Sequence, residues 1–274
     1  MKINLYGEIV SDEWDWIYSL FEIPHCCPRL VREAIEQLGA DEDLILEINS
    51  PGGDVWAGFE IFGLLQGCRA RTEAHIIAMA ASAATTVCSA CDTVLASPVA
   101  QVMIHQPSTW GGYVNNDGAR ELLNFLDSVR ASIINGYVIK AAGKTSRDRF
   151  EALVDESTWM PVQDAIDLGL VDGILDADEE AAQRLREQGG ILVSNMASLS
   201  PAPTALLERY EAAVRAGTMA EAPGHPVDRS GAPAAPETTD AAPVIDRADA
   251  ETVEDLIADW RLQAVIDLER ARPV

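Results

Sequence analysis

The sequence predicts an α/β domain in which strands and helices alternate and pack in layers, followed by a separate C-terminal extension. Two observations carry this prediction. Short apolar runs such as 44–48, which reads LILEI, alternate with longer segments such as 120–142, whose apolar residues recur every three or four positions. The composition also changes near residue 175, and half of the 14 prolines lie between Pro201 and Pro243.

Strands are expected where apolar residues alternate or form short runs, and helices where apolar residues follow the helical period. The expected strands are 3–9, 44–48, 75–79, 94–96, 102–105 and 170–174. The expected helices are 28–38, 55–66, a small-residue helix from about 82, 120–142, 148–153 and 162–168. A turn of sequence SPGG precedes the helix that begins at residue 55.

Composition divides the chain into four parts. Residues 1–175 form the expected globular domain, 176–217 a tail with a short helix over 204–216, 218–250 a linker and 251–274 a C-terminal helix. The linker is rich in Ala, Pro, Asp, Glu and Thr, so it cannot bury enough apolar surface to offset its chain entropy and is expected to be disordered. Each flanking helix is either weakly held on the domain or a segment that binds a partner.

The chain is strongly acidic, because 44 Asp and Glu against 20 Lys and Arg give a formal charge of −24. This charge argues against nucleic acid or an anionic membrane as a partner, since both are bound through Lys and Arg. The N-terminus alternates like a strand and lacks the apolar core of a signal peptide, and the small and apolar run 76–90 is too short for a membrane span. We therefore expect a soluble, cytoplasmic protein.

The five cysteines are odd in number, which fits a reducing compartment. Cys88 and Cys91 form a C-x-x-C motif, which is either a pair of small buried residues on a helix or a redox or zinc site. A zinc or redox site requires a second ligand pair or a βαβ redox context, and the sequence shows neither. No metal or cofactor is therefore expected.

Three junctions between strands and helices carry polar residues that packing alone does not explain. The NSPGG turn at 49–53 has paired glycines, which let a backbone N–H approach a ligand as an oxyanion site requires. Ser82 begins a small-residue helix, either as a nucleophile or as an N-cap. His105 ends an apolar strand, where either a catalytic or a structural histidine fits. A serine, a histidine and a Gly-Gly turn are together the components of an acyl-transfer site.

Four motifs in a fixed order resemble the Clp protease proteolytic subunit (ClpP) family over about residues 2–175. They are INSPGGDVWAGFEIF, AMAASAATTV, MIHQP and ESTWMPVQDAIDLGLVDGI. The resemblance implies a ClpP/crotonase-type fold of stacked ββα units and a serine peptidase with a Ser-His-Asp triad. It implies Ser82 as the nucleophile, His105 as the general base, and the N–H groups of Gly53 and Ala83 as the oxyanion hole.

The resemblance leaves a choice for the triad acid, which in the family precedes the run that reads WMPVQDAIDLGLVD here. The upstream spacing is about two residues shorter than in the housekeeping enzyme, so the resemblance indicates Asp155 first and Glu156 second. Asp148 is another carboxylate that could reach the site. Asp172 closes the run and is expected to be structural.

Several features resemble the ClpP-related head maturation (prohead) proteases of tailed bacteriophages. The first core strand is expected to begin at residue 2, so the segment that ClpP uses to dock an ATPase ring is expected to be missing, and residues 176–274 follow the last expected core strand. The WMP and HQPSTWGG sequences resemble the same group. The resemblance implies a serine endopeptidase in the host cytoplasm, within the procapsid. It would process scaffold, capsid subunits or itself, with capsid, scaffold or portal proteins as partners.

Three other functions stay open from the sequence. They are a bacterial ClpP-like or signal-peptide-peptidase-like enzyme that works with an ATPase, a catalytically silent ClpP-like scaffold protein, and a crotonase-type acyl-CoA enzyme. No CoA-binding pattern is visible for the last. The segment 120–142 has more apolar residues than one packed face requires and matches the family's subunit-joining helix. It predicts a homo-oligomeric ring, with a core-packed helix as the alternative.

Overall fold

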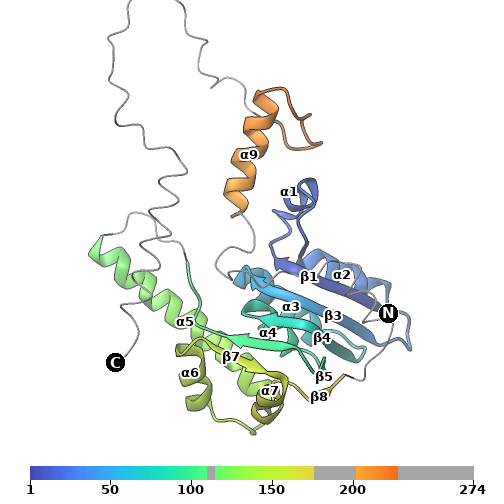
Figure 1. Cartoon of the computed structure of the whole chain (residues 1–274), viewed down its shortest axis with the longest axis vertical. Helices are drawn as coiled ribbons and strands as arrows, with labels where there is room; N and C mark the ends of the chain where they lie inside the picture. The colour runs from blue at the N-terminus through green and yellow to red at the C-terminus, as the bar shows by residue number, and fades with distance from the viewer. Residues whose placement is uncertain (110–114, 176–201, 228–274) are drawn as a thin grey trace, which may run out of the picture. The chain divides into compact units, whose positions relative to one another are not determined.

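The computed structural model describes residues 1–109, 115–175 and 202–227, and it confirms the predicted α/β class. The strands are β1 (Lys2–Ile9), β2 (His25–Cys26), β3 (Leu44–Gly53), β4 (Thr72–Ala81), β5 (Thr93–Ala96), β6 (Gln101–Ile104), β7 (Thr158–Pro161) and β8 (Gly173–Ile174). The helices are α1 (Asp15–Leu20), α2 (Pro28–Gln37), α3 (Val55–Gln66), α4 (Ala83–Cys88), α5 (Asn116–Ala141), α6 (Arg147–Asp155), α7 (Val162–Leu168) and α9 (Pro203–Arg215) (Figure 1).

One sheet, parallel except at β7, organises the described residues. Its main order is β2-β1-β3-β4-β5-β8. Strand β4 is shared, because Glu73–Ile76 pairs with β5 whereas Met79–Ala81 pairs with β6, and β7 then joins β6 in the antiparallel direction. The two strands that precede Ser82 and His105 are therefore neighbours, and the loops that follow them leave the same edge of the sheet.

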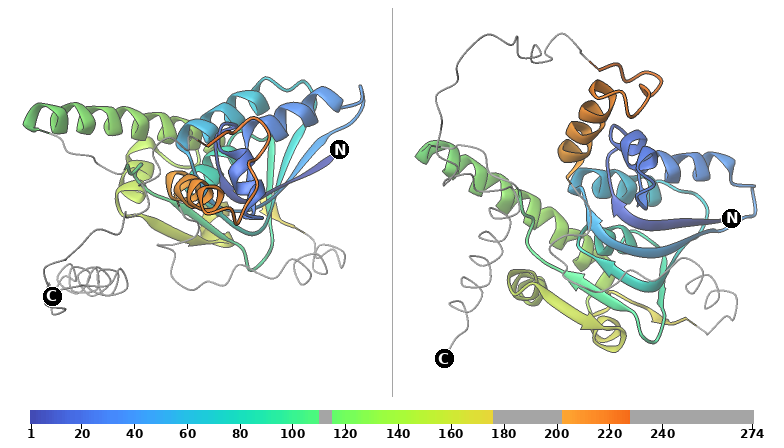
Figure 2. Two further views of the ribbon diagram at one scale, coloured as in Figure 1. Left: turned by 90° about the horizontal axis from the view of Figure 1, so that it is seen from above. Right: turned by 45° about the horizontal axis from the view of Figure 1, so that its top comes forward.

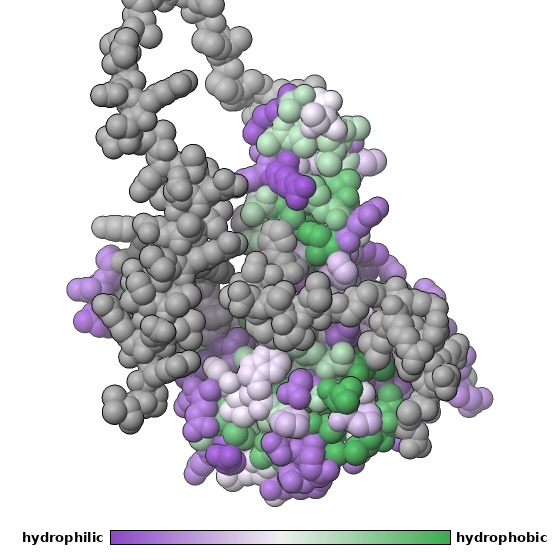
Figure 3. Space-filling view, viewed as in Figure 1, coloured by the Kyte–Doolittle hydropathy of each residue, from purple (hydrophilic) through white to green (hydrophobic). Residues whose placement is uncertain are grey.

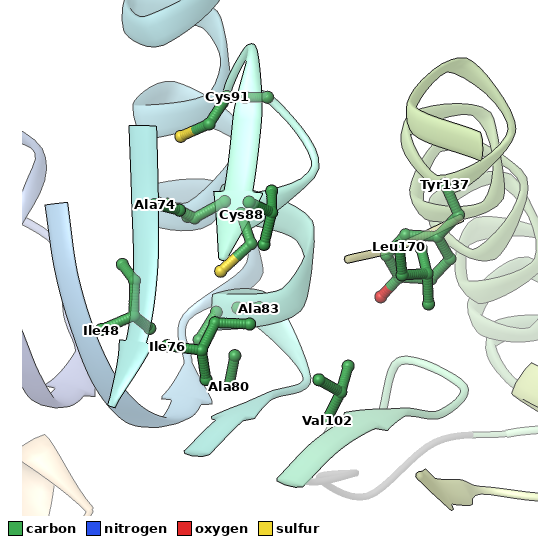
Figure 4. Packing of buried hydrophobic residues seen from close by; sticks show 14 of the residues in the cluster. Ile48, Ala74, Ile76, Ala80, Ala83, Cys88, Cys91, Val102, Tyr137 and Leu170 are labelled. Atoms are coloured by element: carbon green, nitrogen blue, oxygen red, sulfur yellow. The ribbon is translucent and has the colours of Figure 1, made fainter. Parts of the chain in front are cut away.

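Helices α2 and α3 lie side by side on one face of the sheet (Figure 2). The core forms where the sheet meets α3, α4 and α5, and its buried residues make one continuous cluster. Figure 4 shows Ile76 and Val102 of the strands near Ala83 and Cys88 of α4, with Tyr137 of α5 on the far side. Burial of these aliphatic side chains fixes β4 and β6, and with them the start of α4.

Helix α5 buries one face over its C-terminal half and is mostly exposed over its N-terminal half, which extends beyond the sheet (Figures 1 and 2). Val129 and Tyr137 are buried, whereas Leu123 is 62% exposed and Phe125 is 46% exposed. The packed helix and the exposed apolar stripe, which were alternatives from the sequence, thus occur in different halves of one helix.

No helix in the described ranges combines the length and the apolar character that a membrane span requires.

Three short elements were not predicted from the sequence: α1, β2 and β7. They are too short for a periodic signal, and β7 forms only because β6 offers it an edge. The SPGG segment was predicted as a turn, but it completes β3 because Gly52 and Gly53 pair with β1. The strand predicted over 170–174 is restricted to Gly173 and Ile174, which pair with β5.

Helix α9 packs on α1 through aromatic contacts. The Trp16 ring stacks on His225 with centroids 3.8 Å apart and meets Tyr210 edge-on at 5.2 Å. Residues 1–225 form one unit and 226–274 a second. Most of the predicted linker at 218–250 and the whole predicted helix at 251–274 lie outside the described residues, so the predicted domain boundaries stay a prediction.

Candidate active site

Ser82 is the single residue between the end of β4 and the start of α4. Its φ of 56° lies in the left-handed region, which is uncommon for a residue with a side chain and is often found at functional sites. The Ser82 N–H donates to the Met103 carbonyl at 2.9 Å, which fixes the turn against β6. The hydroxyl makes no capping bond to α4, so N-capping does not explain this serine.

His105 follows the last residue of β6 and lies beside Ser82. Its Nε2 is 2.7 Å from the Ser82 Oγ. The buried Thr85 hydroxyl lies 2.8 Å from the carbonyl oxygens of both Ala80 and Met103, and by sharing its one proton between them it ties the ends of the two strands together. Burial lowers the pKa of His105, which favours the neutral imidazole that a general base requires.

Gly52 and Gly53 bring the end of β3 close to the Ser82 turn. A Cβ on Gly52 would lie 2.6 Å from the Ala81 carbonyl oxygen and 2.7 Å from the Ser82 Cβ. Both glycines have positive φ angles, 94° and 144°. Only glycine allows this approach, because a side chain would collide with the backbone around Ser82.

A cavity of about 620 Å³ opens in front of these residues and brings together Ser82, His105, Gly53 and Ala83. Its apolar lining includes Val55, Trp56, Phe59, Phe125, Leu126 and Trp159. The cavity is therefore mostly apolar with a few convergent polar groups, which is the usual form of a ligand site.

Asp155 is the last residue of α6 and is held by two polar side chains. Its Oδ1 accepts hydrogen bonds from Gln106 Nε2 at 2.8 Å and Arg130 Nε at 2.7 Å, and its Oδ2 accepts from Arg130 Nη2 at 2.8 Å. The Arg130 bond, followed by the Gln106 bond, lowers the pKa of Asp155. Within the described ranges, His105 has no hydrogen bond to a carboxylate; its one side-chain partner is Ser82.

The other candidate carboxylates lie elsewhere. Asp172 accepts from the Val94 N–H and from Lys140 Nζ, both at 2.7 Å, and so links β5 to α5, as expected of a structural residue. Asp148 lies in the first turn of α6, about 10 Å along the helix from Asp155 at 1.5 Å per residue. Glu156 is exposed at the C-cap of α6.

Comparison with known proteins gives the family. The Clp protease family model matches residues 25–178. The ATP-dependent Clp protease proteolytic subunit 1 of Chlamydia muridarum (strain MoPn / Nigg) is 34% identical over 149 residues, which cover 52% of this chain and 74% of that protein. The corresponding subunit of Chlamydia pneumoniae is 35% identical over 140 residues, which cover 48% of this chain and 70% of that protein.

The chain belongs to the Clp protease family. Clp proteases are serine peptidases that form oligomeric rings and act on protein substrates. Membership therefore supports peptidase activity.

Three residues around this candidate site were not predicted from the sequence: Thr85, Gln106 and Arg130. Gln106 was overlooked although it directly follows His105. For Arg130 a signal existed, because it precedes the buried Ile133 and Ile134 by three and four positions and thus lies on the buried face of its helix. A charged side chain on such a face usually has a partner.

The C-x-x-C pair of this Clp protease is buried in the core (Figure 4). Cys88 and Cys91 are free thiols, and burial raises the pKa of Cys91 to about 12 and that of Cys88 well above its ordinary value. Buried thiols of this kind are unreactive, which favours packing over redox or zinc chemistry. In the described part of the chain, no three His, Cys, Asp or Glu side chains are grouped to hold a metal.

Proposed function

We propose that this chain is a serine endopeptidase whose nucleophile, general base and acid are Ser82, His105 and Asp155. The observation that carries the proposal is the 2.7 Å contact between His105 Nε2 and Ser82 Oγ at the strained strand-to-helix turn. Family membership and the adjoining apolar cavity give independent support.

The expected reaction uses groups that already adjoin the cavity. Neutral His105 takes the Ser82 proton as Oγ attacks the carbonyl carbon of the peptide bond, and the N–H groups of Gly53 and Ala83 bind the oxyanion. The imidazolium then gives its proton to the leaving amine. A water molecule, deprotonated by His105, attacks the acyl ester and releases the second product together with free Ser82. Asp155 would orient the imidazole and stabilise its cation.

We further propose that the enzyme processes phage procapsid proteins during head maturation, with scaffold, capsid or portal proteins, or its own C-terminal segment, as substrates and partners. The support is sequence resemblance in the WMP and HQPSTWGG motifs. A long acidic, proline-rich extension also follows the family-matched region and suits a segment that tethers the enzyme and is later removed. The exposed apolar residues at the N-terminal half of α5 support assembly into an oligomer.

A second candidate function is a peptidase that works with an ATPase. The observation that favours it is the name of the Chlamydia relatives, which are ATP-dependent proteolytic subunits. The two functions differ in whether the purified chain can cut itself without a partner.

The experiment compares the intact mass of the full-length wild type, Ser82→Ala and Ser132→Ala after incubation, with parallel labelling by a serine-directed phosphonate. Ser132 is the matched control, because among the described residues its hydroxyl bonds to the Ser128 carbonyl of its own helix α5 and to no group of the Ser82–His105 contact. We expect labelling at Ser82 and loss of a piece cut between residues 176 and 250 in the wild type and the control. Labelling without self-cleavage would favour the ATPase-dependent enzyme, and no labelling would favour a silent scaffold protein.

A further inference from the structure

The carboxylate proposed as the triad acid is bound by groups other than the base. Arg130 of α5 contacts both oxygens of Asp155, and Gln106 contacts one of them. A bidentate arginine–carboxylate pair fixes the plane of the carboxylate as well as its position. The acid is therefore held beside the catalytic pair and not bonded to it.

The backbone explains why the acid is close to the base. Strands β6 and β7 pair up to Ile104 and Thr158, so the chain segments next to this pair, His105–Gln106 and Asp155–Ser157, leave the sheet together. Asp155 reaches the Gln106 side chain, one residue beyond His105. The carboxylate proposed as the triad acid is therefore bonded to the residue that directly follows the proposed base.

The arginine is the fixed member of the ion pair, and the aspartate is the movable one. The Arg130 side chain is 20% exposed, and its Nη2 also donates to the Glu151 carbonyl of α6. The Asp155 side chain is 46% exposed and stands at the end of its helix. Figure 3 shows a surface of mixed hydrophilic and hydrophobic residues over the part of the molecule that carries α6, α7 and β7. Because nearly half of the Asp155 side chain is exposed, water reaches this carboxylate.

We propose that Arg130 is a positioning residue that competes with His105 for Asp155. This inference rests on the proposed function. While the ion pair is closed, Ser82 and His105 react without an acidic partner; when it opens, Asp155 accepts a hydrogen bond from His105 Nδ1 and completes the triad. Arg130 thereby sets the fraction of molecules in which the triad is complete.

In the part of the chain that the structure describes, few other titratable or charged groups near His105 could change the pKa of its imidazole. Asp54 at the start of α3 lines the same cavity, and Tyr137 of α5 is its other titratable side chain. Asp155 ends α6 and Glu156 is its C-cap, and Arg130 of α5 pairs with Asp155. Among these groups, and within the described ranges, only Asp155 is hydrogen-bonded to Gln106, the residue that follows His105.

The test is an NMR titration of the His105 imidazole in the full-length Ser82→Ala background, which does not require catalysis. The His105 signal is assigned by its loss in His105→Gln. Arg130→Gln should raise the His105 pKa by about one unit or more, because a nearby carboxylate favours the imidazolium. Adding Asp155→Asn to Arg130→Gln should abolish the rise. Arg130→Lys, which keeps the charge but cannot form the bidentate pair, should give a smaller rise.

The matched control is Arg147→Gln. Arg147 also joins α6 to α5, through Asn135, but it does not contact Asp155. It should leave the His105 pKa unchanged. In the catalytically intact protein, Arg130→Gln should raise kcat several-fold at pH 8, with KM unchanged.

An unchanged His105 pKa in folded Arg130→Gln and Arg130→Lys would overturn the inference, as would a rise that persists after Asp155→Asn. The proposed peptidase function is judged separately, by phosphonate labelling of the wild type. A labelled enzyme with an unmoved His105 pKa refutes only the role of Arg130. A protein that is unlabelled both as wild type and as Arg130→Gln refutes the peptidase function.

Discussion

Ser82 and His105 follow the ends of two paired strands inside the sheet, whereas Asp155 ends a surface helix. The first two are fixed by backbone hydrogen bonds between β4 and β6 and by the buried Thr85, and they meet at 2.7 Å. Asp155 is placed by side chains, those of Arg130 and Gln106. Backbone pairing fixes a residue to a register, but a side-chain contact leaves it free to change partner. The proposed nucleophile and base are therefore preorganised, and the position of the proposed acid is adjustable.

The largest effect on turnover should come from removing Ser82, one of the two preorganised residues. Ser82→Ala should lower kcat by several powers of ten, because no other group in the contact can attack the carbonyl. Hydrolysis of a fluorogenic peptide measures the loss, with Ser132→Ala as the control that stays near wild type. Substantial turnover by folded Ser82→Ala would show that another residue is the nucleophile.

Gly53→Ala tests whether the backbone at the end of β3 supports Ser82 and His105. The added Cβ would lie 2.2 Å from the Ile9 carbonyl oxygen, and the alanine would have to adopt a φ of 144°. The free energy of unfolding should therefore fall by about 1–3 kcal/mol. Activity should fall at least tenfold. Urea denaturation measures the stability.

The control for the glycine prediction is Gly63→Ala. Gly63 is exposed on α3, and apart from its own stretch of helix no atom of the described residues lies within 4 Å of the place that a Cβ would take there, so alanine should stabilise the protein by about 0.5–1 kcal/mol. Equal effects of the two substitutions would contradict a special role for the end of β3.

Asp155→Asn removes the adjustable carboxylate and leaves the Ser82–His105 pair in place, so it measures the two parts of the site separately. We expect kcat to fall at least tenfold, yet less than in Ser82→Ala, because the Ser82–His105 contact survives. The half-exposed ion pair with Arg130 should contribute about 1 kcal/mol or less to stability, so the protein should remain folded. Steady-state kinetics alongside Glu156→Gln separates the two carboxylates. A larger loss in Glu156→Gln would make Glu156 the acid.

The smallest effect is the pH dependence of the wild type. Burial lowers the pKa of His105, so the imidazole loses its proton at a lower pH than usual and the active neutral base persists further into the acidic range. The midpoint of the rise of kcat/KM with pH should therefore lie below the ordinary histidine value of about 6.5. A pH–rate profile measures it. A midpoint above about 7 would mean that Asp155 already pairs with His105 in most molecules.

The sequence predicted much of the fold because the signals were local. The helix expected over 55–66 and that expected over 162–168 have the observed bounds, since each is rich in apolar residues and begins directly after a helix-starting residue, Asp54 and Pro161 respectively. The short elements α1, β2 and β7 are too short to give such a signal. The C-terminal helix expected over 251–274 lies outside the described residues and stays a prediction.

For the site, the order of motifs along the chain indicated Ser82, His105 and the glycines, because each lies at a strand end and strand ends are visible as changes in hydrophobic pattern. The distance between Ser82 and His105 depended on β4 pairing with both β5 and β6. The partner of Asp155 depended on α5 and α6 lying together, which brings Arg130 to a residue 25 positions away. The sequence pattern determines which residues lie at the ends of strands and helices. Only the packing of those strands and helices decides which charged side chains form an ion pair.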